Sequence, residues 1–78
     1  MKEPRRFSLN RDRDHSGVSG TGVVAYGVMF GDGSVVMRWH TPDMPHSTNV
    51  YESITAVKRI HGHGGSTRIV WIDSGGNP

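Results

Sequence analysis

The chain has 78 residues, no cysteine and a formal net charge of +2. A chain of this length forms one small domain over 1–78, and a large active-site cavity would consume too much of its core. Without cysteine there is neither a disulfide framework nor a cysteine-ligated zinc site, which is typical of a reducing compartment. No apolar run reaches the roughly 18 residues of a membrane span, and residues 1–10 lack the apolar segment of a signal peptide. We therefore expect a cytoplasmic protein with no membrane contact and no cofactor.

The first half of the chain predicts one strand and a hairpin. After a flexible basic tail over 1–6, Phe7 and Leu9 alternate with polar residues, as in a short strand at the edge of a sheet. Residues 12–22 contain three glycines and no apolar periodicity, which indicates a long loop. Two apolar, alternating runs then flank the sequence Gly-Asp-Gly at 31–33. This pattern predicts a β-hairpin whose glycines supply positive φ angles.

The second half predicts two strands around a helix. Two prolines in 40–47 end the hairpin, and a short strand follows at 48–51. Ser53 is a good N-cap, and apolar residues then recur at helical spacing until Gly62, the expected C′ residue. A last strand is predicted over 67–73, followed by a Gly-rich flexible tail at 74–78.

This order of elements predicts a mainly β fold, a small five-stranded SH3-like barrel with one short helix before the last strand. The alternative is an α+β arrangement, in which an open antiparallel sheet packs on the helix. Both arrangements bury the same apolar side chains, which we expect to form the core: Val24, Val28, Val35, Met37, Val57, Ile60, Ile69 and Trp71.

Three segments carry a resemblance to a known group of proteins. They are SGVSGTGVVA at 16–25, GVMFGDGSVVMRW at 27–39 and IHGHGGSTRIVWID at 60–73. Together they resemble a functionally uncharacterised group of small proteins from actinobacteria and their phages. The resemblance covers about three quarters of the chain and implies a phage or actinobacterial origin and a cytoplasmic location. It implies no mechanism.

The HGHGG segment at 61–65 is the most suggestive chemically, because the imidazoles of His61 and His63 can ligate zinc or act as acid and base near pH 7. No third ligand stands at a recognisable spacing. We therefore interpret His61 as a cap on the last helical carbonyls, which its cationic form would also favour through the helix dipole. A binding loop and a metal or acid–base site stay open as alternatives.

Two further features have a structural and a functional interpretation. The Gly-rich stretch 17–22 could bind an anion through its backbone N–H groups, but it lacks a P-loop lysine and leads into a strand, which favours a structural turn. Trp39 and Trp71 alternate with the basic residues of their strands and are expected in the core. The basic neighbours, Arg38 and Arg68, then face solvent and are expected to pair with Glu52 or Asp73.

Our leading hypothesis is a small non-enzymatic interaction module, a phage accessory protein that binds a host or phage protein through the loops at 12–22 and 40–47 and the edge strands. The candidate binding residues are His15, Ser19, Thr21, His40, Asp43, His46, His61, His63 and Arg68.

Two alternatives and one addition stay open. A nucleic-acid-binding β-barrel would place arginines on phosphates, and a histidine-dependent metal or hydrolase site would use the HGHGG segment. Self-association through an open edge strand is a further possibility. The arginines assigned to phosphates in the first alternative are Arg5, Arg6, Arg11, Arg13 and Arg68.

Overall fold

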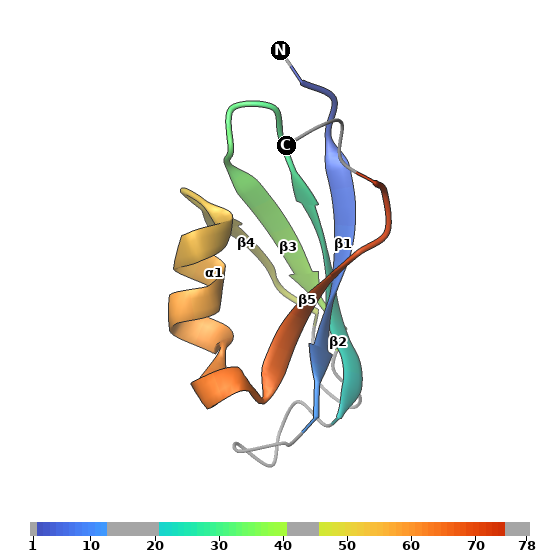
Figure 1. Ribbon diagram of the computed structural model, residues 1–78, viewed down its shortest axis with the longest axis vertical. Helices are drawn as coiled ribbons and strands as arrows, with labels where there is room; N and C mark the ends of the chain where they lie inside the picture. Colours follow the sequence, from blue (N-terminus) through green and yellow to red (C-terminus); the bar gives the residue numbers. More distant parts are fainter. Residues whose placement is uncertain (1, 13–20, 41–45, 75–78) are drawn as a thin grey trace.

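A computed structural model describes residues 2–12, 21–40 and 46–74. Five strands form one antiparallel sheet in the order β4-β3-β2-β1-β5, and the helix α1 connects β4 to β5 (Figure 1). The elements are β1 (Arg5–Arg11), β2 (Gly22–Met29), β3 (Val35–Trp39), β4 (Thr48–Tyr51), α1 (Ile54–His61) and β5 (Thr67–Trp71).

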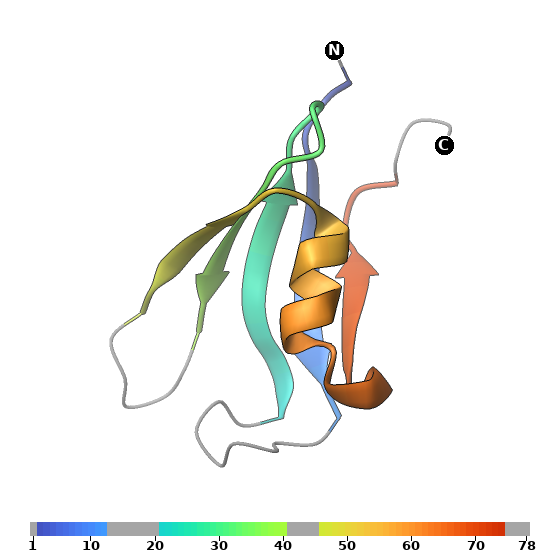
Figure 2. The same cartoon turned by 90° about the vertical axis from the view of Figure 1, so that its left-hand side faces the viewer.

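The predicted mainly β fold, with five strands and one short helix before the last strand, is confirmed. The sheet is not closed into a barrel, however, because β4 and β5 lie at its opposite edges and do not pair. The open antiparallel sheet, our alternative, is what forms. The helix contacts both edge strands, and Figure 2 shows it in front of the sheet with β4 on one side and β5 on the other. In a barrel, hydrogen bonds would join the two edge strands, whereas here α1 packs between β4 and β5.

The central hairpin forms as predicted from β2 and β3. In its turn the N–H of Gly33 donates to the carbonyl of Phe30 at 2.9 Å, and Asp32 accepts from both the N–H and the hydroxyl of Ser34. Gly33 has a φ of 92°, in the region that favours glycine, whereas Gly31 does not adopt a positive φ. One of the two glycines therefore supplies the special angle.

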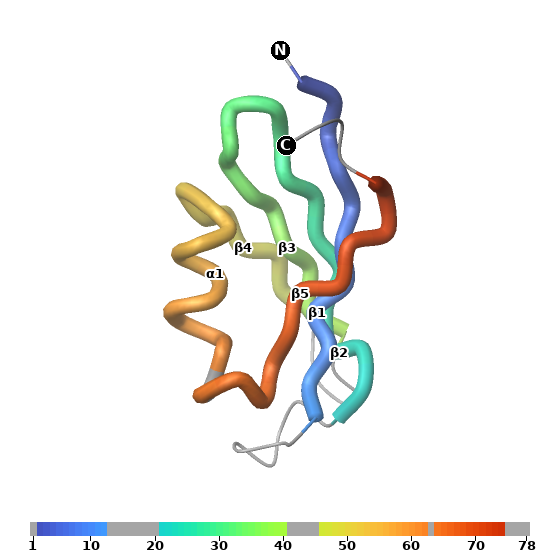
Figure 3. The backbone as a smooth tube through the Cα atoms, in the orientation of Figure 1, coloured from blue at the N-terminus to red at the C-terminus, as the bar shows by residue number. Residues whose placement is uncertain are grey.

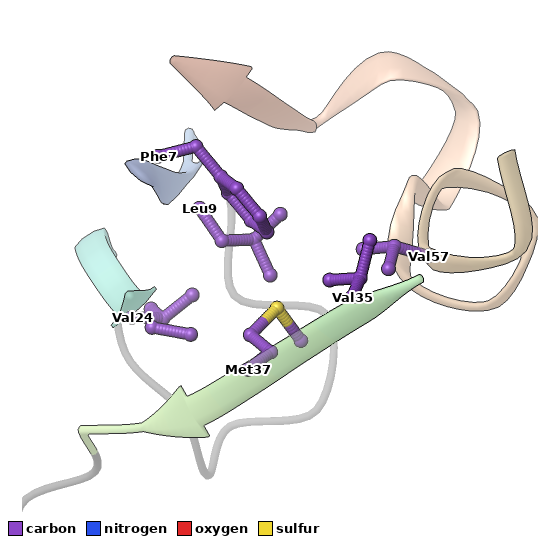
Figure 4. Close-up of a cluster of buried hydrophobic side chains, with 7 residues drawn as sticks. Phe7, Leu9, Val24, Val35, Met37 and Val57 are labelled. Carbon is purple, nitrogen blue, oxygen red and sulfur yellow. The ribbon is translucent and has the colours of Figure 1, made fainter. Parts of the chain in front are cut away.

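The strand that contains Phe7 and Leu9 is not at the edge of the sheet, as the short alternating pattern predicted. It begins at Arg5 and pairs along its length with β2 and for five residues with β5, so it lies inside the sheet. Phe7 and Leu9 are consequently among the most buried side chains (Figure 4). The buried residues of the hydrophobic core are Phe7, Leu9, Val24, Ala25, Val35, Met37 and Val57. Partly buried side chains, including Trp39, Ile69 and Trp71, pack against this core.

The prediction that Val28 is buried in the core is wrong, because β2 contains a β-bulge. The residues that pair with Leu9 and Asn10 are Ala25 and then Val23, so one residue of β2 has no partner in the register. Val24 and Ala25 are both buried as a result. The alternation beyond the bulge places Val28, which is half-buried, on the face away from α1.

The helix begins as predicted at Ser53, whose hydroxyl accepts a hydrogen bond from the N–H of Ala56 at 3.1 Å. Its Val57 is buried, whereas Ile60, which we expected in the core, is 59% exposed. Only one side chain of α1 thus reaches full burial, since the short helix meets the sheet mainly along one line.

The helix ends at Gly62, but with a different geometry from the one predicted. Gly62 has a φ of −67°, and its N–H donates to the carbonyl of Lys58. The left-handed conformation occurs instead at Gly64 and Gly65, with φ of 65° and 97°. These two residues belong to the short 3-10 turn η1 (His63–Gly65), through which the chain reverses into β5 (Figure 3).

Candidate functional site

The helix α1 lies on one side of the sheet, and no described helix or strand covers the other side (Figure 1). We call it the outer face. Val28, Val36 and Val50 form a row across it, because they are cross-strand partners on β2, β3 and β4. Val50, at the end of the row, is 77% exposed. The residues that the register places on the outer face are Arg6, Ser8, Asn10, Tyr26, Val28, Val36, Arg38, Thr48, Val50, Arg68 and Val70.

Tyr26 lies near the centre of the outer face and is 54% exposed. Its cross-strand partners are Ser8 on β1 and Arg38 on β3, and Ser8 also pairs with Val70 on β5. Arg38 donates to the hydroxyl of Thr48 at 3.1 Å, which helps to hold its guanidinium on this face. Tyrosine and arginine are enriched at protein–protein contacts, and the row of valines adds exposed apolar area beside them.

The opposite face holds a polar and aromatic cluster beneath the end of α1. The hydroxyl of Tyr51 lies 2.9 Å from Nε2 of His61, and the ring of His61 meets Trp39 edge-on at 4.8 Å. Arg11 is only 4% exposed; its Nε donates to the hydroxyl of Thr67 at 3.2 Å, and its guanidinium lies over Trp39 at 5.8 Å. The cluster joins β1, β3, β4 and β5 to the last turn of α1.

Burial raises the pKa of Tyr51, and a hydrogen bond with Trp39 opposes this shift. The Tyr51 phenol is thus neutral at physiological pH and holds His61 between the helix and the sheet. The contacts of His61 with Tyr51 and Trp39 join the last turn of α1 to β3 and β4, and the cap on the helical carbonyls stays a prediction.

The described candidate residues do not gather at one site. The rings of His40 and His46 lie 5.4 Å apart next to β3 and β4, whereas His61 belongs to the cluster beneath α1 and Arg68 lies in β5. Thr21 is exposed just before β2. The remaining candidates, His15, Ser19, Asp43 and the side chain of His63, lie outside what the structure describes.

The predicted ion pairs of Arg38 and Arg68 with Glu52 or Asp73 are not formed. Arg68 forms an ion pair with Asp12 at 3.0 Å, and Arg38 bonds to a threonine instead of to Glu52. Asp73 pairs with Arg6 at 2.8 Å. The antiparallel pairing of β1 with β5 explains both ion pairs, because it brings the two ends of the chain together.

The hydrogen bonds from Arg6 lower the pKa of Asp73 to about 2, so this carboxylate is charged throughout the neutral range. Both ion pairs are exposed, and each contributes little to stability. Of the arginines that the nucleic-acid alternative places on phosphates, Arg6 and Arg68 already pair with carboxylates, and Arg11 is buried. The alternative stays a prediction.

An open pocket lies at the end of the molecule where the hairpin turn meets the two ends of the described chain. At its side Arg5 stacks over the ring of Trp71 at 3.9 Å. The pocket wall combines charges of both signs with half-exposed apolar groups, including Lys2, Arg5, Phe30, Asp32, Ile72 and Asp73. This mixture defines no single class of ligand.

In the part of the chain that the structure describes, no three histidine, aspartate or glutamate side chains lie close enough together to hold a metal ion. Across 2–12, 21–40 and 46–74, no helix has the length and apolar character to span a membrane.

Sequence reasoning missed Arg11, Tyr51 and Thr67 in the cluster, and it missed the outer face as a surface. Alternation in 48–51 could have placed Tyr51 and Val50 on opposite faces. The contacts of Arg11 depend on the pairing of β1 with β5, which joins residues 56 positions apart, and no local signal predicts them.

The fold and these surfaces define a small single-sheet protein with one helix-covered face and one uncovered face. A family model described as Acb5 phage protein matches residues 4–73. The match includes every strand and the helix and leaves out only the two ends of the chain. The chain therefore belongs to this phage protein family. Neither curated proteins nor solved structures gave a significant match.

Proposed function

We propose that this phage protein is a non-enzymatic accessory module that works in the cytoplasm of an actinobacterial host by binding a partner protein through its outer face. The observation that supports the proposal is the uncovered apolar row of Val28, Val36 and Val50 beside the exposed ring of Tyr26. Half-buried and exposed apolar side chains that touch one another gain free energy when a partner removes them from water.

The distribution of polar groups on the two faces supports this choice over the helix side. Beneath α1 the polar groups of Arg11, Tyr51 and His61 bond to other groups of the chain. On the outer face, Tyr26 contributes a large amphipathic ring at the centre of the sheet. Tyrosine is suited to a contact surface because it has few rotatable bonds and offers both an apolar ring and a hydroxyl.

A matched pair of charge substitutions tests the proposal. Tyr26→Glu places a carboxylate at the centre of the outer face, and Thr55→Glu places one on the exposed surface of α1. Each tagged variant is expressed during infection and purified next to the unmodified protein, and the co-purified proteins are quantified by mass spectrometry. Circular dichroism checks that both variants are folded.

We expect a protein that co-purifies with the unmodified chain and with Thr55→Glu, and whose recovery falls at least about tenfold with Tyr26→Glu, since an unpaired buried charge costs more than 1.4 kcal/mol. Equal recovery with both variants, or loss with Thr55→Glu alone, would contradict the proposal. A salt-sensitive mobility shift of DNA or RNA without any specific protein partner would favour the nucleic-acid alternative.

A further inference from the structure

The edge strand β4 has no neighbouring strand on the side away from β3 in the part of the chain that the structure describes. The N–H of Trp39 donates to the carbonyl of Ser47 at 2.9 Å, so these two residues form a hydrogen-bonded pair. Such pairs alternate along antiparallel strands. In the register of β3 and β4, Asn49 and Tyr51 therefore bond to β3, whereas the N–H and C=O groups of Thr48 and Val50 point outward.

Apart from its shortness, the strand lacks the features that usually protect an edge from pairing. Its sequence, TNVY, has no charged residue and no proline, and its register with β3 is free of bulges. Val50 is the most exposed of the large apolar side chains in the described chain. The other edge strand, β5, differs because it carries Arg68, held in an ion pair with Asp12.

We propose that β4 pairs antiparallel with β4 of a second copy of this chain, about a two-fold axis at Val50. In this register Val50 of each copy exchanges both backbone hydrogen bonds with Val50 of the other, which uses the outward groups described above. Thr48 of each copy then lies opposite Glu52 of the other. The two five-stranded sheets become one sheet of ten strands with two-fold symmetry.

The side chains of the outer face fit this register. The row of Val28, Val36 and Val50 continues into the same three residues of the second copy, so six valines lie side by side across the junction. Arg38 neighbours Thr48 on the outer face, and Glu52 of the second copy lies on the far side of that threonine. The two-fold axis thus places an arginine and a glutamate of opposite charge near each other twice.

The short junction sets the expected affinity. A four-residue edge buries less than the roughly 1,200–2,000 Å² of a stable standard-size interface. We therefore expect a reversible dimer that forms in the micromolar range or above. The inference goes beyond partner binding and does not rest on it. Val50 belongs to both surfaces, but the dimer is measured on the purified chain, where no partner protein is present.

A single introduced cysteine tests the register, because the chain contains none of its own. In Val50→Cys the two cysteines would lie across a hydrogen-bonded pair with α-carbons about 5.5 Å apart, within the range of a disulfide. Val70→Cys is the matched control, since Val70 is an exposed outer-face valine on the other edge strand. Both are oxidised with a copper–phenanthroline reagent and followed on non-reducing gels.

We expect Val50→Cys to form covalent dimers at least about tenfold faster than Val70→Cys. In analytical ultracentrifugation, Val50→Lys should weaken the dimer of the otherwise unmodified chain at least tenfold, because it places two like charges at the axis. A chain that stays monomeric up to millimolar concentration would overturn the proposal. Equal cross-linking rates for the two cysteine variants would overturn the register.

Discussion

Gly27→Ala should destabilise the fold because the ring of Phe7 occupies the space of the missing side chain. Gly27 and Phe7 are cross-strand partners. A β-carbon at position 27 would lie 2.6 Å from Cε1 and 2.8 Å from Cε2 of the ring, and closer still to Cζ. The ring is fully buried and meets Trp71 edge-on at 5.4 Å, so it has no open space into which to move.

The size of the effect follows from two opposing terms. Overpacking a well-packed core costs typically about 1–3 kcal/mol. Replacement of glycine inside a strand recovers about 0.5–1 kcal/mol of backbone entropy. Because three ring atoms lie closer than any β-carbon tolerates, we expect the clash to dominate, with a net loss of about 1–2 kcal/mol. For a domain of this size each kcal/mol lowers the melting temperature by about 4–8 °C.

Urea denaturation of Gly27→Ala, Phe7→Leu and the double variant measures both the loss and its cause. Leucine lacks the ring edge that the new methyl group meets. We therefore expect the double variant to lose at least about 0.5 kcal/mol less than the sum of the two single losses. A Gly27→Ala protein as stable as the original chain, or strictly additive losses, would refute the packing argument.

Two more predictions concern single contacts. Arg6 lowers the pKa of Asp73 from 3.8 to about 2, so the stabilisation by this pair is present above about pH 4 and is lost as the pH falls through about 2. Between these pH values, the urea midpoint of Asp73→Asn should therefore fall less steeply with decreasing pH than that of the original chain. Parallel curves for the two proteins would contradict this prediction. Ser53→Ala removes the N-cap hydrogen bond from Ala56 and should lower the free energy of unfolding by about 0.5–2 kcal/mol. Ser53→Asp can still accept that bond and should leave the free energy of unfolding unchanged. Equal losses for both variants in urea denaturation would contradict this role of the cap.

Local sequence patterns predicted most elements of this fold because each depends on neighbours in the chain. The glycines at 31–33 predicted the hairpin, and Ser53 predicted the start of α1, both of which the structure contains. The strand at 48–51 has the predicted bounds. These features depend on turn chemistry and capping, which act over a few residues.

The errors in strand placement involve contacts between distant residues. Val28 faces outward because a bulge at Val24 shifts the alternation, and no local signal marks that bulge. Phe7 lies inside the sheet because β5 returns to pair with β1 from the other end of the chain. A barrel and an open sheet share the same strand order and differ in whether the edge strands pair, and here β4 and β5 do not.

The same limit applies to the candidate site. Histidines attracted attention because of their chemistry, yet His61 packs against Tyr51 and Trp39 beneath the helix. The outer face contains no reactive residue type that a motif search would select. It becomes visible only when the register places Val28, Val36 and Val50 in one row.

A photo-cross-linking phenylalanine derivative at position 26, compared with the same derivative at position 55, tests most directly whether the outer face binds a partner. Each chain is expressed during infection, irradiated in cells and purified under denaturing conditions. We predict a discrete protein adduct from position 26 that is absent from position 55 and is lost when Val36→Glu is added. Adducts that are the same from both positions, or none from position 26, would contradict the central claim.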